Sequence, residues 1–299
     1  MIHSSSPGKL MLFGEHSVVY GNPCIATSVN KRLDVYVEEN NEILIEGMNK
    51  ISKFPSNENE HKFLNLTIEK IFEELEKKGK KPNKKFKIRT TQLEKGIGSS
   101  SAVVVSSLKA LSHFYNLNLS NEEIFEIGFK IVNEIQGKAS GYDIAVAVYG
   151  GTIFYQNFEN KYRIEKLKNL KNLLAIYTGK YSDTTELIKE IHEKFLKYPE
   201  IIKGIFEITN EIVKNAKEAI ENEDYEVIGN LMNINHGILN SLNLSDEEIE
   251  NLINETKKFC YGAKISGAGR GDYIIALCKD KENLKNLSEI LNKKGIKNF

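Results

Sequence analysis

A glycine- and serine-rich loop, Gly96 to Ala102, leads directly into the apolar segment Val103 to Tyr115, whose composition is compatible with a helix. The two glycines of this loop let the backbone approach a ligand closely, and the first N–H groups of a following helix have no partners within that helix. Together they favour the binding of an anion such as phosphate. The hydroxyl groups of Ser99, Ser100 and Ser101 add ligands for phosphate oxygens or for Mg²⁺, which binds oxygen.

This loop matches neither of the two commonest phosphate-binding motifs. It lacks the Lys-Ser/Thr pair of the Walker motif, and Ser101 stands where the dinucleotide-binding motif Gly-x-Gly-x-x-Gly requires its last glycine. The loop alone is therefore also compatible with a serine-rich turn that caps a buried helix. Other segments have to distinguish the two interpretations.

Three further segments combine glycine with charged and polar residues: Pro7 to Gly21 (PGKLMLFGEHSVVYG), Gly137 to Asp143 (GKASGYD) and Lys264 to Tyr273 (KISGAGRGDY). Each segment is weak evidence by itself. In their order and spacing, together with the glycine-serine loop, they resemble the motifs of the galactokinase, homoserine kinase, mevalonate kinase and phosphomevalonate kinase superfamily, the GHMP kinases. The resemblance extends from residue 7 to about residue 278.

The resemblance implies phosphoryl transfer from ATP to a small alcohol, a reaction in which positioning and charge neutralisation dominate catalysis. Asp143 corresponds to the catalytic base that receives the proton of the acceptor hydroxyl. Lys9 corresponds to a lysine that keeps this carboxylate ionised and steadies the reacting oxygen. Taken alone, Asp143 could be a turn residue after a glycine, and Lys9 could be a surface lysine.

By the same resemblance, two glycine-containing segments bind the phosphates of ATP. The residues concerned are Gly96, Gly98, Ser99, Ser100, Ser101, Gly267 and Gly269. Relatives usually carry glycine at the position that Arg270 occupies here. A guanidinium at this point could hold a phosphate with two hydrogen bonds or could face solvent.

The resemblance also implies a Mg²⁺ ion with Ser100 as a ligand. Many relatives carry a second metal ligand, a glutamate 11 residues before the catalytic aspartate, but that position here is Val132. Glu134, two residues later, could replace it or could be an ordinary exposed helix residue. Ser100 could also suffice, because phosphate and water oxygens complete the coordination of Mg²⁺.

Three residues are expected on the acceptor side of the site: His16, Ser140 and Thr184. Thr184 resembles a threonine that contacts the substrate in mevalonate kinases, although it could instead be the N-cap of a helix. His16, beside Glu15, could shape the substrate pocket or could be a purely structural histidine.

Within the superfamily, the first segment and the Asn22-Pro23 pair that follows it look most like mevalonate kinases. The segments Ser101 to Val105, Asp143 to Gly151 and Gly271-Asp272 look more like phosphomevalonate kinases. We predict ATP-dependent phosphorylation of the C5 hydroxyl of (R)-mevalonate to 5-phosphomevalonate, in the pathway to isoprenoids. The main alternative is a phosphomevalonate kinase, and others are a different GHMP kinase or a catalytically silent homologue that senses a ligand.

Composition agrees with a small-molecule enzyme. The 299 residues include 41 Lys plus Arg and 41 Asp plus Glu, and this balance gives no indication of a nucleic-acid partner. No stretch approaches the length of a membrane span and the N-terminus lacks a signal-type segment, so we expect a cytoplasmic protein. Cys24, Cys260 and Cys278 form neither a disulfide framework nor a metal motif, and we expect reduced, buried thiols. A homodimer is compatible with this sequence.

Hydrophobic periodicity indicates the elements that must position these residues, and it gives an α+β pattern. It predicts a helix over His61 to Lys78, a strand over Lys84 to Thr91 that leads towards the glycine-serine loop, and a strand over Ile144 to Asn157. Two capping boxes, Ser120-x-x-Glu123 and Ser245-x-x-Glu248, predict helix starts. Further helices are predicted over 184–196 and 205–221 and from 281, and further strands over 173–177, 264–266 and 273–277.

The resemblance implies that these elements form the two-lobed GHMP kinase fold. The N-terminal lobe, 1–158, would resemble domain 2 of ribosomal protein S5 and would carry the phosphate loop and the catalytic aspartate. The C-terminal lobe, 159–299, would be a ferredoxin-like α/β lobe.

Overall fold

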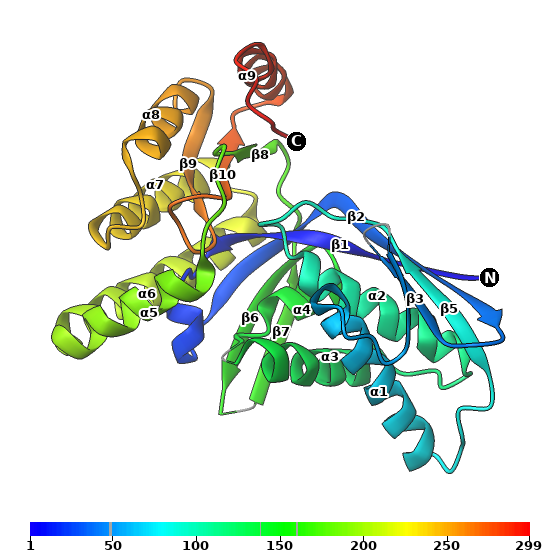
Figure 1. Cartoon of the computed structure of the whole chain (residues 1–299). Coiled ribbons are helices and arrows are strands. Elements are labelled where there is room, and N and C mark those ends of the chain that lie inside the picture. The colour runs from blue at the N-terminus through cyan, green and yellow to red at the C-terminus, as the bar shows by residue number, and fades with distance from the viewer. Residues whose placement is uncertain (48–49, 138, 160) are drawn as a thin grey trace. The chain divides into compact units, whose positions relative to one another are not determined.

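The computed structural model describes residues 1–47, 50–137, 139–159 and 161–299 (Figure 1). The chain falls into two compact units: unit 1 comprises Met1–Lys9 and Ser28–Gly150, and unit 2 comprises Leu10–Thr27 and Gly151–Phe299. This division differs from the single boundary after residue 158 that we predicted. The reason is that the long strands β1 (Ile2–Phe13) and β2 (Cys24–Asn40) each contribute residues to both units.

The sheet of unit 1 has the strand order β4-β3-β5-β2, and β1 also pairs with β2. Its other strands are β3 (Leu44–Gly47), β4 (Lys50–Lys53) and β5 (Lys85–Thr90). β5 runs antiparallel to β2 and parallel to β3. Alternate residues of β5, Phe86 and Ile88, are fully buried, as expected for a strand with one face in the core.

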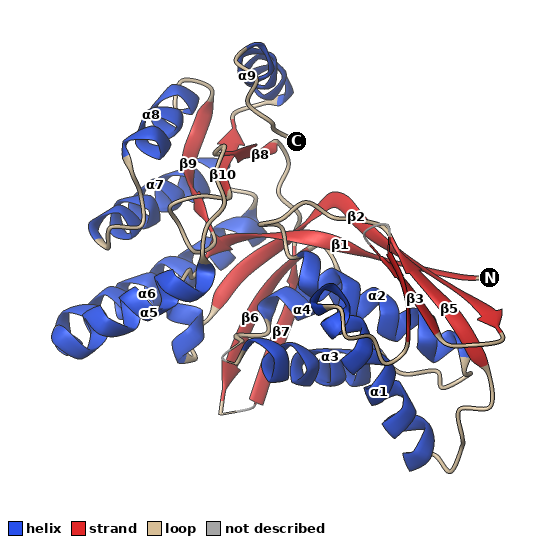
Figure 2. Ribbon diagram, in the orientation of Figure 1, coloured by secondary structure: helices blue, strands red, loops and turns tan. Residues whose placement is uncertain are grey.

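Four helices of unit 1 lie on one side of these strands and pack against one another (Figure 2). They are α1 (Lys62–Lys77), α2 (Ser99–Phe114), α3 (Asn121–Gln136) and α4 (Tyr142–Tyr149). α2 is buried along most of its length, and the Ser106 hydroxyl donates a hydrogen bond to the carbonyl oxygen of Leu33 on β2. The N-terminal turns of α2 and α4, which carry the predicted site residues, are therefore fixed to a packed core.

The mixed helix and sheet architecture confirms the predicted fold class, and most predicted elements of unit 1 are present. The helix over 61–78 is α1, the strand over 84–91 is β5, and the Ser120 capping box opens α3. The strand over Ile144 to Asn157 was wrong in its first half, because residues 142–149 form α4 before β6 (Thr152–Phe158) begins. A short helix that is buried on all sides is uniformly apolar, and periodicity cannot separate it from a buried strand.

Unit 2 contains a three-stranded antiparallel sheet in the order β8-β10-β9. Its strands are β8 (Leu173–Tyr177), β9 (Cys260–Ser266) and β10 (Tyr273–Cys278). In the same unit, β6 pairs with Cys24–Thr27 of β2 and with β7 (Lys161–Leu167). A short 3-10 helix, η1 (Ser17–Tyr20), follows β1.

The helices of unit 2 are α5 (Thr184–Lys197), α6 (Pro199–Asn222), α7 (Tyr225–Ser241), α8 (Glu247–Thr256) and α9 (Lys281–Lys293). Of these, α7, α8 and α9 pack against the three-stranded sheet. α7 packs closely on β9, because a Cβ atom at Gly262 would lie 2.1 Å from the carbonyl oxygen of Gly229. Only glycine at both positions allows this approach. The contact fixes β9, which leads into the segment Lys264 to Tyr273, against α7.

The predicted strands at the end of the chain and the helix from residue 281 are confirmed by β9, β10 and α9. The capping box at Ser245 was wrong. The N-cap of α8 is Asp246, whose Oδ1 accepts a hydrogen bond from the N–H of Ile249 at 3.0 Å. The Ser245 hydroxyl instead donates to Glu250 at 2.5 Å, because the aspartate one residue later takes the capping position.

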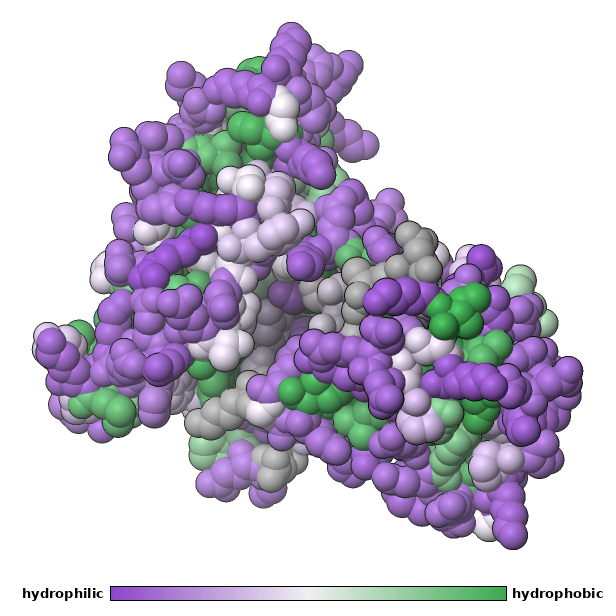
Figure 3. Space-filling view, in the orientation of Figure 1, coloured by the Kyte–Doolittle hydropathy of each residue, from purple (hydrophilic) through white to green (hydrophobic). Residues whose placement is uncertain are grey.

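The face of the molecule drawn in Figure 3 is mostly hydrophilic, with hydrophobic residues in separate patches. Within the described ranges, no helix combines the length and apolar character needed to cross a membrane. The three cysteines are buried, as predicted.

Candidate active site

The glycine-serine loop of unit 1 lies directly against β1 at Lys9. The N–H of Lys9 donates to the carbonyl oxygen of Ile97 at 2.8 Å. Gly98 is the N-cap of α2 with φ +81°, and a Cβ atom there would lie 2.8 Å from the Cγ of Lys9. Both the left-handed backbone and the close contact require glycine, so Gly98 places the lysine side chain beside the first turn of α2.

Asp143 is the second residue of α4, whose N-cap Gly141 has φ +90°. The hydroxyl of Ser101, in the first turn of α2, donates a hydrogen bond to Oδ2 of Asp143. Ser101 is buried, whereas Asp143 is partly exposed. The start of α2 thus holds the carboxylate at the start of α4 through one of its oxygens, Oδ2.

Lys9 lies next to this carboxylate-bearing turn. Its ammonium group lies 5.4 Å from the ring centroid of Tyr142, the residue before Asp143. Unit 1 therefore brings together Lys9, Gly98, Ser101 and Asp143, all of which the sequence singled out. A carboxylate, an ammonium group and the free N–H groups of a helix start can accept a proton and bind phosphate oxygens.

Three other predicted residues of unit 1 lie at these helix starts. Ser99 and Ser100 are the first two residues of α2 and Ser140 precedes Gly141, and all three are partly exposed. Gly96 lies two residues before the N-cap of α2 and has φ +86°. Lys138, within the predicted motif, lies outside the described residues.

The structure gives Glu134 a different environment from the predicted metal site. It lies on α3 with its side chain 58% exposed, and its carboxylate is 3.8 Å from the ammonium group of Lys70 on α1. Val132, at the position where relatives carry a glutamate, is buried in the core. Across the part of the chain that is described, no group of three or more His, Cys, Asp and Glu side chains is arranged to hold a metal ion. Ser100 as a ligand for Mg²⁺ stays a prediction.

In unit 2, a buried ion pair joins Glu15, of the segment Pro7 to Gly21, to Lys264, of the segment Lys264 to Tyr273. The ammonium group of Lys264 on β9 donates to the carboxylate of Glu15 and, at 2.6 Å, to the carbonyl oxygen of Ile265. Both side chains are fully buried. Burial raises the pKa of Glu15 and lowers the pKa of Lys264, while their attraction opposes both changes.

His16 has a structural contact to the third motif within unit 2. Its Nε2 lies 2.8 Å from the carbonyl oxygen of Ala268. Burial lowers the pKa of His16, so the ring is neutral near pH 7, and because a carbonyl only accepts, Nε2 must carry the proton. This contact is consistent with a structural histidine, and a role in shaping a substrate pocket stays a prediction.

The loop between β9 and β10, Gly267–Asp272, has an unusual backbone. Gly267 and Gly269 have φ +98° and +99°, and the two non-glycine residues Arg270 and Asp272 also have positive φ, +50° and +55°. The N–H of Arg270 donates to the carbonyl oxygen of Leu244 at 2.8 Å. A left-handed conformation costs non-glycine residues free energy, so surrounding contacts must hold this loop.

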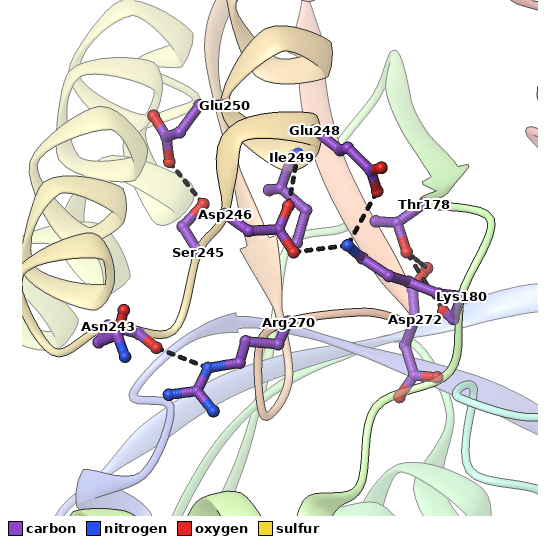
Figure 4. A network of polar contacts seen from close by, with 10 residues as sticks. All are labelled: Thr178, Lys180, Asn243, Ser245, Asp246, Glu248, Ile249, Glu250, Arg270 and Asp272. Carbon is purple, nitrogen blue, oxygen red and sulfur yellow. Dashed lines mark hydrogen bonds and ion pairs between the residues drawn. The ribbon is translucent and has the colours of Figure 1, made fainter.

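Arg270 is neither a free phosphate clamp nor a solvent-facing residue. Its Nη1 and Nη2 donate to the two carboxylate oxygens of Glu190 on α5 at 2.8 and 2.7 Å. Its Nε donates to the carbonyl oxygen of Asn243 at 2.8 Å (Figure 4). Neither predicted alternative included this ion pair, in which the Glu190 carboxylate accepts from the two terminal nitrogens of the guanidinium.

Thr184 is the first residue of α5 and is exposed. It is not the N-cap, because Asp183 has that position and accepts hydrogen bonds from the N–H groups of Thr185 and Glu186, both at 3.0 Å. The hydroxyl of Thr184 is thus not used for capping, and its predicted contact with the substrate stays a prediction.

Sequence reasoning missed three partners in these sites. Lys264 was quoted only as the first residue of a motif, Glu190 was not singled out, and Ser101 was assigned to phosphate rather than to Asp143. The only signal for Lys264 is a lysine inside an otherwise apolar strand pattern, since a charge there must find a partner. No signal in the sequence relates Glu190 to Arg270, because the two are 80 residues apart.

Two family models match the chain: "GHMP kinases N terminal domain" over residues 65–151 and "GHMP kinases C terminal" over residues 216–297. A curated mevalonate kinase of Thermococcus onnurineus is 35% identical over 308 residues, which cover 94% of this chain and 90% of that protein.

Solved structures agree with these matches. The mevalonate kinase of Methanococcus jannaschii has a TM-score of 0.84 at 30% identity, and the match covers 99% of this chain and 96% of that one. The phosphomevalonate kinase of Streptococcus pneumoniae, in complex with phosphomevalonate and AMPPNP, has a TM-score of 0.88. At 20% identity over 99% of this chain and 98% of that one, the latter shows the fold alone.

Proposed function

Because this chain belongs to the GHMP kinase family, we propose that it catalyses the ATP-dependent phosphorylation of (R)-mevalonate. ATP is the co-substrate, as in other small-molecule kinases of the family. The observation that carries the proposal is similarity to curated mevalonate kinases over 94% of the chain. Among these comparisons, the phosphomevalonate kinase alternative has fold similarity alone, at 20% identity.

The reaction that we propose is an in-line transfer to the C5 hydroxyl. The hydroxyl oxygen forms a bond to the γ-phosphorus while the bond from that phosphorus to ADP breaks, and the hydroxyl proton passes to Asp143. The hydrogen bond from Ser101 to Oδ2 supports this role, because it orients the carboxylate and leaves Oδ1 for the proton. Lys9, beside Tyr142, is proposed to steady the reacting oxygen.

We assign the phosphates of ATP to backbone N–H groups. In unit 1, these are the groups around Gly96, Gly98 and the serines that begin α2, where unpaired N–H groups and the helix dipole attract anions. In unit 2, the same role is proposed for Gly267 and Gly269. Glycine at these positions leaves the backbone open to a ligand.

Mg²⁺ is part of the proposal, and the donor chemistry of unit 1 fits it. Ser100 offers a hard hydroxyl oxygen at the start of α2, and Mg²⁺ commonly takes few protein ligands together with phosphate oxygens. When bound, the ion would neutralise negative charge on the phosphates. Glu134 is not retained as a ligand, because it lies against Lys70.

A role in acceptor binding is proposed for Ser140 in unit 1, and separately for His16 and Thr184 in unit 2. Ser140 and Thr184 are polar and incompletely buried, and each lies near a helix start. Neutral His16 could only help to shape the pocket, because its Nε2 is already engaged by Ala268.

An acceptor panel tests the proposed function. ADP release is measured with ATP and (R)-mevalonate, 5-phosphomevalonate, homoserine or galactose as acceptor. We expect turnover with (R)-mevalonate and little with the others. Turnover with 5-phosphomevalonate alone would favour the alternative kinase, and ATP binding without turnover of any alcohol would favour a ligand-sensing homologue. The homodimer stays a prediction, which sedimentation velocity can check.

A further inference from the structure

We propose that the Arg270–Glu190 ion pair is a positioning link between the β9–β10 loop and helix α5, through which nucleotide and acceptor binding affect one another. The proposal rests on the proposed function, because it takes Gly267 and Gly269 as phosphate-binding and Thr184 as acceptor-binding. Arg270 itself then touches neither ligand. All residues of the link belong to unit 2.

The guanidinium of Arg270 has no pair of neighbouring N–H groups left that could bind a phosphate with two parallel hydrogen bonds. Nη1 and Nη2 bind the two oxygens of Glu190, and Nε binds the carbonyl oxygen of Asn243. Arg270 lowers the pKa of Glu190 through these hydrogen bonds, so the carboxylate is ionised at neutral pH. A bidentate pair of this kind fixes direction as well as distance.

The backbone of Arg270 is held together with its side chain. Its φ of +50° and the hydrogen bond from its N–H to Leu244 place the peptide next to Gly269 in one conformation. Gly269 itself is tightly enclosed, since a Cβ there would lie 2.5 Å from the carbonyl oxygen of Leu244. A shift of Arg270 must therefore move the glycine that precedes it.

The other end of the loop is joined to the segment that leads into α5. The N–H of Asp272 donates to the carbonyl oxygen of Lys180 at 2.9 Å, and the N–H of Ser182 donates to Oδ1 of Asp272 at 3.3 Å. The N–H of Thr178 donates to the carbonyl oxygen of Asp272 at 2.9 Å. The loop is thus attached both to the approach of α5 and, through Glu190, to its second turn.

Lys180 anchors that approach segment in turn. Its ammonium group lies 2.5 Å from a carboxylate oxygen of Asp246 and 2.9 Å from one of Glu248 (Figure 4). Thr184 begins α5 only four residues later. Because α5 is a rigid helix held at both points, a displacement of the loop by nucleotide changes the position of Thr184, and the converse also holds.

The test compares Arg270→Gly, Glu190→Ala and the double variant. Glycine is the informative replacement for Arg270, because it accepts φ +50° without strain and removes only the side chain. We expect each single variant to raise KM for ATP and for (R)-mevalonate together by about fivefold to tenfold, with a smaller change in kcat. The double variant should resemble either single variant, because both remove the same link. Arg270→Lys, which keeps one charged donor, should lie between wild type and Arg270→Gly.

A distant ion pair of unit 2 supplies the matched control. Lys294 binds both oxygens of Glu255 at 2.8 and 2.7 Å, and this pair does not contact the loop. Replacing both residues by alanine should leave both KM values unchanged. A phosphate clamp would give another pattern: Arg270→Gly would raise only KM for ATP, and Glu190→Ala would leave it unchanged or lower it. That pattern, or a fall in melting temperature with unchanged KM values, would overturn the proposal.

Calorimetric titration separates this inference from the proposed function. ADP binding is measured on wild type, both single variants and the double variant, without any acceptor or turnover. We expect the same non-additive loss of ADP affinity as for KM. If wild type fails to turn over (R)-mevalonate but the loss is present, the function fails and the link to the nucleotide loop stands. Additive or absent losses in an active enzyme would reject the link alone.

Discussion

The two polar centres of this molecule are built in different ways. In unit 1, Asp143 is partly exposed, and its carboxylate accepts a hydrogen bond from Ser101 where the starts of α2 and α4 meet. In unit 2, the carboxylate of Glu15 is fully buried against Lys264, and the β9–β10 loop is tied to its surroundings by side chains from several elements.

The difference indicates a division of labour between the two centres. A group that exchanges a proton with a substrate must stay accessible, so it can have few partners. A loop that presents backbone N–H groups gains from being fixed in advance, and buried contacts do this because their loss is costly. We therefore expect substitutions in unit 1 to reduce turnover at nearly constant stability and substitutions in unit 2 to reduce stability or binding.

Replacement of the proposed base should have the largest effect on turnover. Asp143→Asn keeps the shape of the side chain and removes its ability to accept a proton. We expect kcat to fall by about 10²- to 10⁴-fold, with a melting temperature close to that of wild type. ADP release and thermal unfolding measure the two quantities. A variant that keeps more than about a tenth of wild-type kcat would remove Asp143 from the role of base.

Breaking the buried ion pair should have the largest effect on stability. Lys264→Met leaves the carboxylate of Glu15 buried without its partner, and we expect the free energy of unfolding to fall by about 3–5 kcal/mol. Adding Glu15→Gln should recover a large part of this loss, because the uncompensated charge is gone. Urea denaturation at pH 7 measures both. A single variant within about 1 kcal/mol of wild type would contradict a structural role for the pair.

Removal of the Ser101 hydroxyl should have a moderate effect confined to catalysis. Ser101→Ala frees Oδ2 of Asp143, and we expect kcat to fall by about fivefold to tenfold, the equivalent of one hydrogen bond of about 1 kcal/mol. Ser107→Ala is the matched control, since Ser107 is buried on the same helix and its hydroxyl has no hydrogen-bond partner among the described residues. Equal effects of the two variants would indicate packing rather than positioning.

The smallest expected effect concerns the pH dependence of stability. Burial lowers the pKa of His16 in the folded state, whereas in the unfolded chain it is about 6.5. Below about pH 6.5 the unfolded state therefore binds a proton that the folded state does not, and stability falls as pH decreases further. His16→Gln, which cannot titrate, should show a shallower fall of the free energy of unfolding between pH 7 and pH 5.5. An unchanged slope would mean that the ring becomes protonated in the folded state.

The site of unit 1 could be predicted from the sequence better than the contacts of unit 2. The site of unit 1 depends on glycine at fixed backbone positions and on polar residues that directly follow them. Such local patterns can be recognised in the sequence. The sequence could not show which of three adjacent serines faces Asp143, because that depends on the angle between α2 and α4. It also mistook α4 for a strand, since a uniformly buried segment carries no period.

The centre of unit 2 depends on contacts between distant parts of the chain. Arg270 was recognised as unusual, but its partner lies 80 residues away on another helix. Lys264 and Glu15 are 249 residues apart. Asp246 and Ser245 are adjacent, so either could be the N-cap of α8 by local sequence alone. The contact of Asp246 with Lys180, which is distant in the sequence, favours Asp246. Tertiary packing, rather than local preference, determines these pairings.

The most direct measurement is phosphorus NMR of one reaction that contains ATP, Mg²⁺, (R)-mevalonate and 5-phosphomevalonate at equal concentrations. With wild type we expect growth of the phosphomonoester signal at the rate of ADP formation, and no such growth with Asp143→Asn on the same time scale. Conversion of the monoester to a diphosphate would contradict the assignment of mevalonate as acceptor. Equal rates for wild type and Asp143→Asn would contradict the assignment of the base.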